Sequence, residues 1–61
     1  MPFVRIEMLS GRSTEQKARL ASAITKAMVE IANAKAEDTN IVFADIARAD
    51  WAVAGRLIAD G

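Results

Sequence analysis

The sequence predicts an α/β protein built on a single β-α-β unit, with a short C-terminal hairpin or tail. Residues 2–9 alternate apolar and polar side chains, and residues 41–46 form an almost unbroken apolar run. Between them, apolar residues recur with a helical period. With only 61 residues, the chain makes one domain (1–61) that is marginally stable alone. We therefore expect oligomerisation to complete the fold.

The first expected strand covers residues 2–9. Its apolar face consists of Val4, Ile6 and Met8. Arg5 and Glu7 point to the other face, since successive side chains of a strand alternate. Pro2 suits the first strand position because it removes no essential ladder donor there.

A turn at residues 10–12 leads into a helix that begins with a capping box. Ser13 is the expected N-cap and accepts from the backbone N–H of Gln16, whose side chain reaches back. The helix continues to about Asn33, a residue type that adopts the left-handed conformation at helix ends. Lys17 falls outside the apolar stripe. That stripe consists of Leu20, Ile24, Ala27, Met28 and Ile31.

The apolar run that begins after Asn40 and ends near Ile46 predicts a second strand covered on both faces. Such strands occur mostly in parallel sheets, so we expect a right-handed β-α-β crossover. Two strands and one helix cannot cover their own faces. Residues 47–61 show no clear period, and this tail together with other subunits must supply the missing cover.

The composition argues against several classes of protein. The chain has no Cys and no His, so disulfides, thiolate metal sites and the commonest metal ligand are missing. Eight basic residues balance eight acidic ones, so we expect no nucleic-acid partner. No apolar run approaches the roughly 18 residues of a membrane span, and a signal-peptide pattern is missing. We therefore expect a cytoplasmic protein with no membrane partner.

Pro2 is the residue best suited to acid-base chemistry. If Met1 is removed, Pro2 carries a secondary amine at the N-terminus. A primary α-amino group titrates near about 7.7–8.0. An apolar wall or a nearby cation favours the neutral amine and so lowers this pKa. The amine would then be able to accept a proton at working pH. The alternative is a proline that only begins a strand.

Two motifs accompany this proline: residues 11–17 read Gly-Arg-Ser-Thr-Glu-Gln-Lys, and residues 51–55 read Trp-Ala-Val-Ala-Gly. In this order and at these separations, they resemble the 4-oxalocrotonate tautomerase family of small tautomerases. The resemblance covers essentially the whole chain. It implies a tautomerase-like fold and a homohexamer, often described as a trimer of dimers. It also implies an enzyme that needs no cofactor.

The resemblance implies roles for four residues. Pro2 matches the family's general acid or base, and Arg12 matches an arginine that holds a substrate carboxylate. Trp51 matches a large aromatic residue that lines the pocket. Asn40 stands where the archetype has a second arginine, which polarises a substrate oxygen. Asn brings no positive charge. Asn40 therefore contacts the substrate as an amide, or Arg48 or Arg56 supplies the charge from another direction.

Our main hypothesis is an isomerase that moves a proton within a small unsaturated 2-oxo or 2-hydroxy carboxylic acid, by enol-keto conversion. Two alternatives stay open. The same proline could serve a hydratase, dehalogenase or decarboxylase of a small unsaturated acid, or the chain could be a non-catalytic oligomeric module. The other residues also have structural alternatives: a solvated turn for Arg12, an interface or core aromatic for Trp51, and a strand-start hydrogen bond for Asn40.

Overall fold

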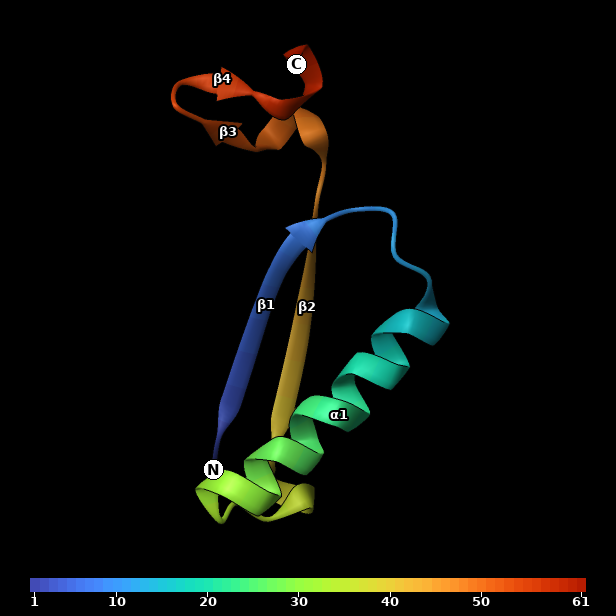
Figure 1. Ribbon diagram of the computed structural model, residues 1–61, viewed down its shortest axis with the longest axis vertical. Helices are drawn as coiled ribbons and strands as arrows, with labels where there is room; N and C mark the ends of the chain where they lie inside the picture. Colours follow the sequence, from blue (N-terminus) through green and yellow to red (C-terminus); the bar gives the residue numbers. More distant parts are fainter.

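The computed structural model describes residues 1–61 and confirms the β-α-β unit with a short hairpin. Figure 1 shows α1 running back across the two strands, opposite to their direction. The two longer strands pair in parallel, as predicted. The elements in order are β1 (Phe3–Leu9), α1 (Thr14–Ala32), the 3₁₀ turn η1 (Ala36–Asp38), β2 (Asn40–Ile46), η2 (Arg48–Asp50), β3 (Ala52–Val53), β4 (Arg56–Leu57) and η3 (Ile58–Asp60).

Both ends of α1 form as the sequence predicts. The Ser13 hydroxyl accepts from the backbone N–H of Gln16 at 3.1 Å. In return, the Gln16 side-chain oxygen accepts from the backbone N–H of Ser13 at 2.8 Å. Two of the unpaired donors at the start of the helix are thereby satisfied. At the other end Asn33 adopts a left-handed conformation, with φ of 56°, which stops the helix.

The side of α1 that faces the sheet differs from the predicted stripe. Leu20 is 38% exposed and Ile31 is 82% exposed, and Ala27 is also exposed. The prediction was therefore wrong for these three residues within the single chain. Two strands are too narrow to cover the whole apolar arc of the helix, so one flank remains open. The half-buried residues of α1 are Lys17, Ala21, Ile24, Thr25 and Met28.

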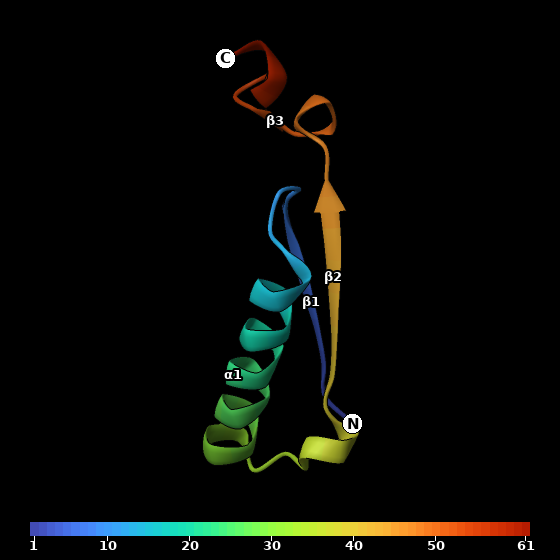
Figure 2. The same cartoon turned by 90° about the vertical axis from the view of Figure 1, so that its right-hand side faces the viewer.

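Only one face of the two-stranded sheet is covered. Figure 2 shows α1 on one side of β1 and β2, with no element on the other side. The even-numbered residues of β1 are half-buried, whereas Phe3, Arg5 and Glu7 are exposed. On β2, Val42 is 37% exposed. The expectation that β2 is covered on both faces is therefore wrong for the single chain.

Residues 47–61 form short elements rather than an irregular tail. Strands β3 and β4 pair antiparallel, with Val53 opposite Arg56. The two residues between them, Ala54 and Gly55, both have positive φ, 54° and 80°, as the tight turns of two-residue hairpins require. This hairpin lies beyond the ends of β1 and β2 that are farthest from the N-terminus (Figure 1).

The single chain has no closed core. No residue is buried, although 52% of the residues are hydrophobic. Burial of apolar surface is the main favourable term in folding, so a chain without buried residues lacks much of its stabilisation. This finding supports the expectation that other subunits cover the open surfaces. The most exposed apolar side chains of the folded segments are Phe3, Ile31 and Val53.

Candidate active site

Pro2 and Asn40 lie together at one end of the sheet. Pro2 is half-buried at the head of β1, and its carbonyl oxygen accepts from the backbone N–H of Asn40 at 3.0 Å. The Asn40 side-chain amide donates to the carbonyl oxygen of Asp38 at 3.2 Å. Asn40 therefore makes the strand-start hydrogen bond that the sequence allowed, and its other amide atoms remain open to a ligand.

Arg12 lies at the opposite end of the sheet. It belongs to the exposed turn between β1 and α1, and its guanidinium donates to the carbonyl oxygen of Leu9 at 3.1 Å. The same turn is joined to β2, because the N–H of Ser10 donates to the carbonyl oxygen of Ile46 at 2.9 Å. The guanidinium keeps free donors with which it could bind a carboxylate bidentately.

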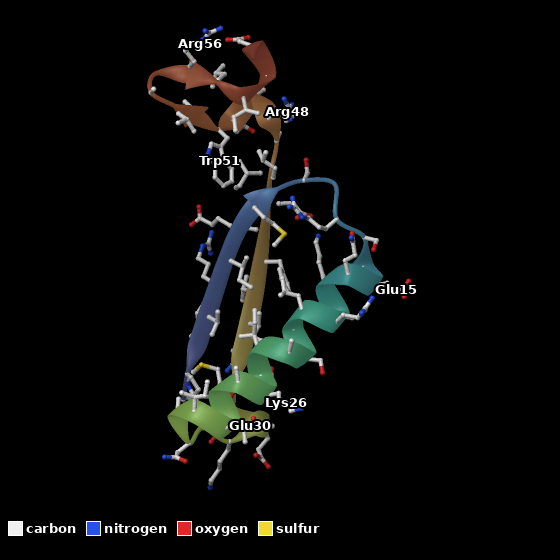
Figure 3. The ribbon with its side chains drawn as sticks, in the orientation of Figure 1. Glu15, Lys26, Glu30, Arg48, Trp51 and Arg56 are labelled. Carbon is white, nitrogen blue, oxygen red and sulfur yellow. The ribbon has the colours of Figure 1, made fainter.

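Trp51 lies near the Arg12 end, in the C-terminal segment. This residue is half-buried, and its carbonyl oxygen accepts from the N–H of Ile58 at 2.9 Å. Arg48 donates to the carbonyl oxygen of Ile58 at 3.1 Å, which ties η2 to η3. Figure 3 shows the Trp51 ring between the hairpin and the ends of the strands, and Arg56 at the far side of the hairpin.

The single chain does not bring the four candidate residues together. Pro2 and Ser10 are separated by a strand that rises about 3.3 Å per residue, which gives roughly 25 Å between the two ends. Pro2 is thus paired with Asn40 alone, and Arg12 shares its end with Trp51. The one surface hollow, of about 450 Å³, lies elsewhere on α1 and η1. It contains none of the four residues. A site that contains all four therefore requires at least two copies of the chain.

An ion pair that the sequence reasoning missed lies behind the Arg12 turn. Lys17, in the first turns of α1, donates its ammonium to the carboxylate of Asp45 on β2. Both side chains are partly shielded, with exposures of 24% and 41%. A signal was present, since Asp45 shares a strand face with Ile41 and Phe43. A charge on a covered face requires a partner.

Two further features are relevant to function. No three His, Cys, Asp or Glu side chains gather into a group able to hold a metal ion. The only long helix, α1, lacks the apolar length of a membrane-crossing segment.

Comparison with known proteins identifies the family. The family model described as tautomerase enzyme matches residues 2–61. The chain belongs to the tautomerase family. It is 38% identical over 55 residues to a 2-hydroxymuconate tautomerase of Comamonas testosteroni, covering 90% of this tautomerase and 87% of the relative. Family membership makes it a small isomerase-type enzyme.

Solved structures agree with this assignment. The crystal structure of YwhB, a homologue of 4-oxalocrotonate tautomerase, superposes with a TM-score of 0.95 at 33% identity, covering 98% of both chains. A heterohexameric 4-oxalocrotonate tautomerase from Chloroflexus aurantiacus J-10-fl has a TM-score of 0.91 at 35% identity, covering 98% of this tautomerase and 97% of that chain. The predicted fold is confirmed, and a hexameric assembly exists among its relatives.

Proposed function

We propose that this tautomerase uses the amine of Pro2 as general base and acid to interconvert enol and keto forms of a small unsaturated 2-oxo or 2-hydroxy carboxylic acid. The main support is that the family match begins at Pro2 itself. A second support is position: Pro2 directly precedes an edge strand, and its carbonyl oxygen accepts a hydrogen bond from the backbone N–H of Asn40. Removal of Met1, which is 94% exposed, would free the amine.

The chemistry is a proton relocation. The neutral amine takes the proton of the enol hydroxyl, and the electrons shift through the conjugated system towards a distant carbon. The protonated amine then returns the proton to that carbon, so that nothing is oxidised or reduced. A base with a pKa near the working pH is the most effective one for both steps.

We infer that the remaining groups come from another copy of the chain. Arg12 of the partner subunit would hold the carboxylate. Trp51 of the partner subunit, or of a third subunit, would exclude water. Asn40 lies beside Pro2 in the same chain and would donate a hydrogen bond to the substrate oxygen. An amide stabilises developing negative charge less than a cation does. We therefore expect slower turnover of 4-oxalocrotonate than an arginine at this position would give.

The direct test is the variant Pro2→Ala, assayed on the enol of phenylpyruvate and on 2-hydroxymuconate. Loss of a positioned general base costs about 10²–10⁴-fold in rate, and we expect kcat to fall by such a factor. Arg19→Ala, on the exposed side of α1, serves as the control. Mass spectrometry should show that active protein lacks Met1. Unchanged turnover by Pro2→Ala would remove the proline from the mechanism.

A mixing experiment tests whether the site is shared. Pro2→Ala and Arg12→Ala chains are each expected to be nearly inactive. When they are unfolded together and refolded, mixed assemblies contain some sites with both an intact Pro2 and an intact Arg12. Activity should then reappear in the mixture. A mixture as inactive as its components would show that the two residues do not act in one shared site.

A further inference from the structure

The contacts that hold Trp51 lie mainly within the C-terminal segment, residues 47–61. This segment lies beyond the ends of β1 and β2 (Figure 1), and its elements η2, β4 and η3 contact mainly one another. Strands β3 and β4 have two residues each, and an isolated two-stranded hairpin is marginally stable in water. The position of Trp51 therefore depends on the few hydrogen bonds that close this segment.

Both backbone groups of Ile58 are engaged at the base of the hairpin. The N–H of Ile58 donates to the carbonyl oxygen of Trp51 at 2.9 Å. The carbonyl oxygen of Ile58 accepts from the guanidinium of Arg48 at 3.1 Å and from the N–H of Gly61 at 3.2 Å. Because η2 begins at Arg48 and Trp51 directly follows it, the bonds from Arg48 to Ile58 and from Ile58 to Trp51 close the base of the hairpin.

The guanidinium of Arg48 makes no ion pair. The three ion pairs of the chain use Arg5, Lys17 and Lys26 as their cations. Within residues 47–61, the bond from Arg48 is the one hydrogen bond that a side chain makes. A hydrogen bond from a charged donor is stronger than one between neutral groups. Arg48 is therefore the single side chain that can fasten the base of the hairpin.

We propose that Arg48 is a positioning residue for Trp51: by binding the carbonyl oxygen of Ile58, it closes the base of the hairpin and fixes the tryptophan that lines the proposed active site. This role deepens the proposed function and rests on it for the part that Trp51 plays in turnover. The sequence leaves open whether Arg48 brings its charge to the substrate. In the role proposed here, that charge acts on the backbone of the hairpin instead.

The first test uses the fluorescence of Trp51, the only tryptophan of the chain. Arg48→Met removes the charged donor and keeps an apolar side chain of similar reach. The emission of Trp51 should shift to longer wavelength and acrylamide should quench it more strongly, because an indole that is no longer held in place meets more water. Arg48→Lys keeps one charged donor, and a single bond to a carbonyl needs only one, so it should restore most of the wild-type emission.

Arg19→Met is the matched control, since it removes an exposed arginine of α1 and should leave the emission unchanged. Circular dichroism shows whether each variant keeps its helix. Where Arg48→Met does not fold, the milder Arg48→Gln, which removes the charge and shortens the side chain, is measured in the same way. Unchanged emission and quenching in a folded variant that lacks the Arg48 charge would overturn the proposal.

The second test cuts the other bond of Ile58. Ile58→Pro removes the N–H that donates to Trp51. The backbone can accept this change, because Ile58 is the first residue of η3 and Leu57 has φ of −69° and ψ of 142°, the extended conformation that suits a residue before proline. The emission of Trp51 should shift in the same direction as in Arg48→Met. Ile58→Val keeps the N–H and most of the apolar side chain, and should leave the emission unchanged. An equal shift in Ile58→Val would assign the effect to side-chain packing and overturn the role of these hydrogen bonds.

The third test is kinetic and compares single with double variants on the enol of phenylpyruvate. If Arg48 acts only through Trp51, Arg48→Met should lower kcat/KM by no more than Trp51→Ala does. The double variant Arg48→Met/Trp51→Ala should then have the same kcat/KM as Trp51→Ala alone, since residues that act through one another are not additive. An arginine that touches the substrate would instead lower kcat/KM by the same factor with and without Trp51. That result would overturn the proposal.

The role of Arg48 and the proposed function can fail separately. Fluorescence needs no substrate, so it decides whether Arg48 holds Trp51 even if no turnover is found. The expected shift in emission together with an inactive wild type would contradict only the proposed function. An active enzyme in which Arg48→Met leaves the emission of Trp51 unchanged would contradict only the role of Arg48.

Discussion

The ammonium of Lys17 on α1 binds the carboxylate of Asp45 on β2, across 28 positions of the sequence. This ion pair joins the start of the helix to the strand that leads into the Trp51 segment. The nearby bond from Ser10 to Ile46 ties the turn that carries Arg12 to the same strand. The two parts of the chain that supply Arg12 and Trp51 are thus held to one another.

Removing this ion pair should reduce stability by a measurable amount. We expect Lys17→Met to lower the free energy of unfolding by about 0.5–1 kcal/mol, the upper part of the range for partly exposed pairs. The measurement is urea denaturation at a fixed protein concentration, since the expected assembly of subunits would couple stability to concentration.

Lys26→Met is the matched control for Lys17→Met. Lys26 and Glu30 are 3.9 Å apart and largely exposed, at 77% and 60%, so we expect almost no change. If both variants lowered the free energy of unfolding equally, the Lys17–Asp45 pair would stabilise the protein no more than the exposed Lys26–Glu30 pair does.

The capping box at the start of α1 offers a second prediction. Ser13→Ala removes the hydroxyl that accepts from the N–H of Gln16 and leaves that donor without a partner. The expected cost is about 1 kcal/mol of stability. Ser22→Ala, on the exposed side of α1, is the control and should change stability little or raise it slightly. Circular dichroism during denaturation measures both. A Ser13→Ala variant as stable as the wild type would contradict the capping role.

These local features were predictable from the sequence because each depends on a few neighbouring residues. The period of α1, its capping box and the parallel β-α-β order all follow from patterns within single elements. The direction in which α1 faces the sheet did not follow, because it depends on contacts with strands that are distant in the sequence, of which the Lys17–Asp45 ion pair is one. The apolar arc of the helix is also wider than two strands can cover. The distribution of apolar residues along α1 therefore does not decide which side of the helix faces the sheet.

In the candidate site, too, the sequence predicts individual residues but not their full arrangement in space. Pro2, Arg12 and Trp51 were identified by motif, and the predicted strand over residues 2–9 already separates Pro2 from Arg12. The position of Trp51 near the Arg12 end follows only from the fold. The hairpin was left open as a hairpin or tail because its strands have two residues each, too few for a period. Its turn also uses Ala54, a residue type that rarely signals positive φ.

The conformation of Ala54 leads to the third prediction. Its φ of 54° lies in the left-handed region, which costs a residue with a Cβ roughly 1–2 kcal/mol. Asn and Gly are favoured at this position of a two-residue hairpin turn. Ala54→Asn should therefore raise the free energy of unfolding by about 1 kcal/mol, measured by denaturation at fixed concentration.

The neighbouring turn residue is the control for Ala54→Asn. Gly55 has φ of 80°, so Gly55→Ala places a Cβ in the same unfavourable region and should destabilise the protein. We expect the free energy of unfolding to rise in Ala54→Asn and to fall in Gly55→Ala. Destabilisation by Ala54→Asn would contradict the prediction.

The pH profile of the enzyme provides the fourth prediction, on the proposed role of Pro2. A general base must be neutral in the free enzyme, so kcat/KM should rise as pH rises through the pKa of the amine and then level off. An apolar wall disfavours the protonated amine and lowers its pKa. Trp51→Ala admits water and should raise this pKa, which moves the rising limb of the profile to higher pH. Leu20→Ala removes apolar atoms at a 38% exposed position nearer the middle of α1 and should leave the limb in place. If kcat/KM of Trp51→Ala rises at the same pH as that of the wild type, Trp51 does not lower the pKa of the amine. If the rise moves to higher pH in both variants, a general loss of packing explains the shift.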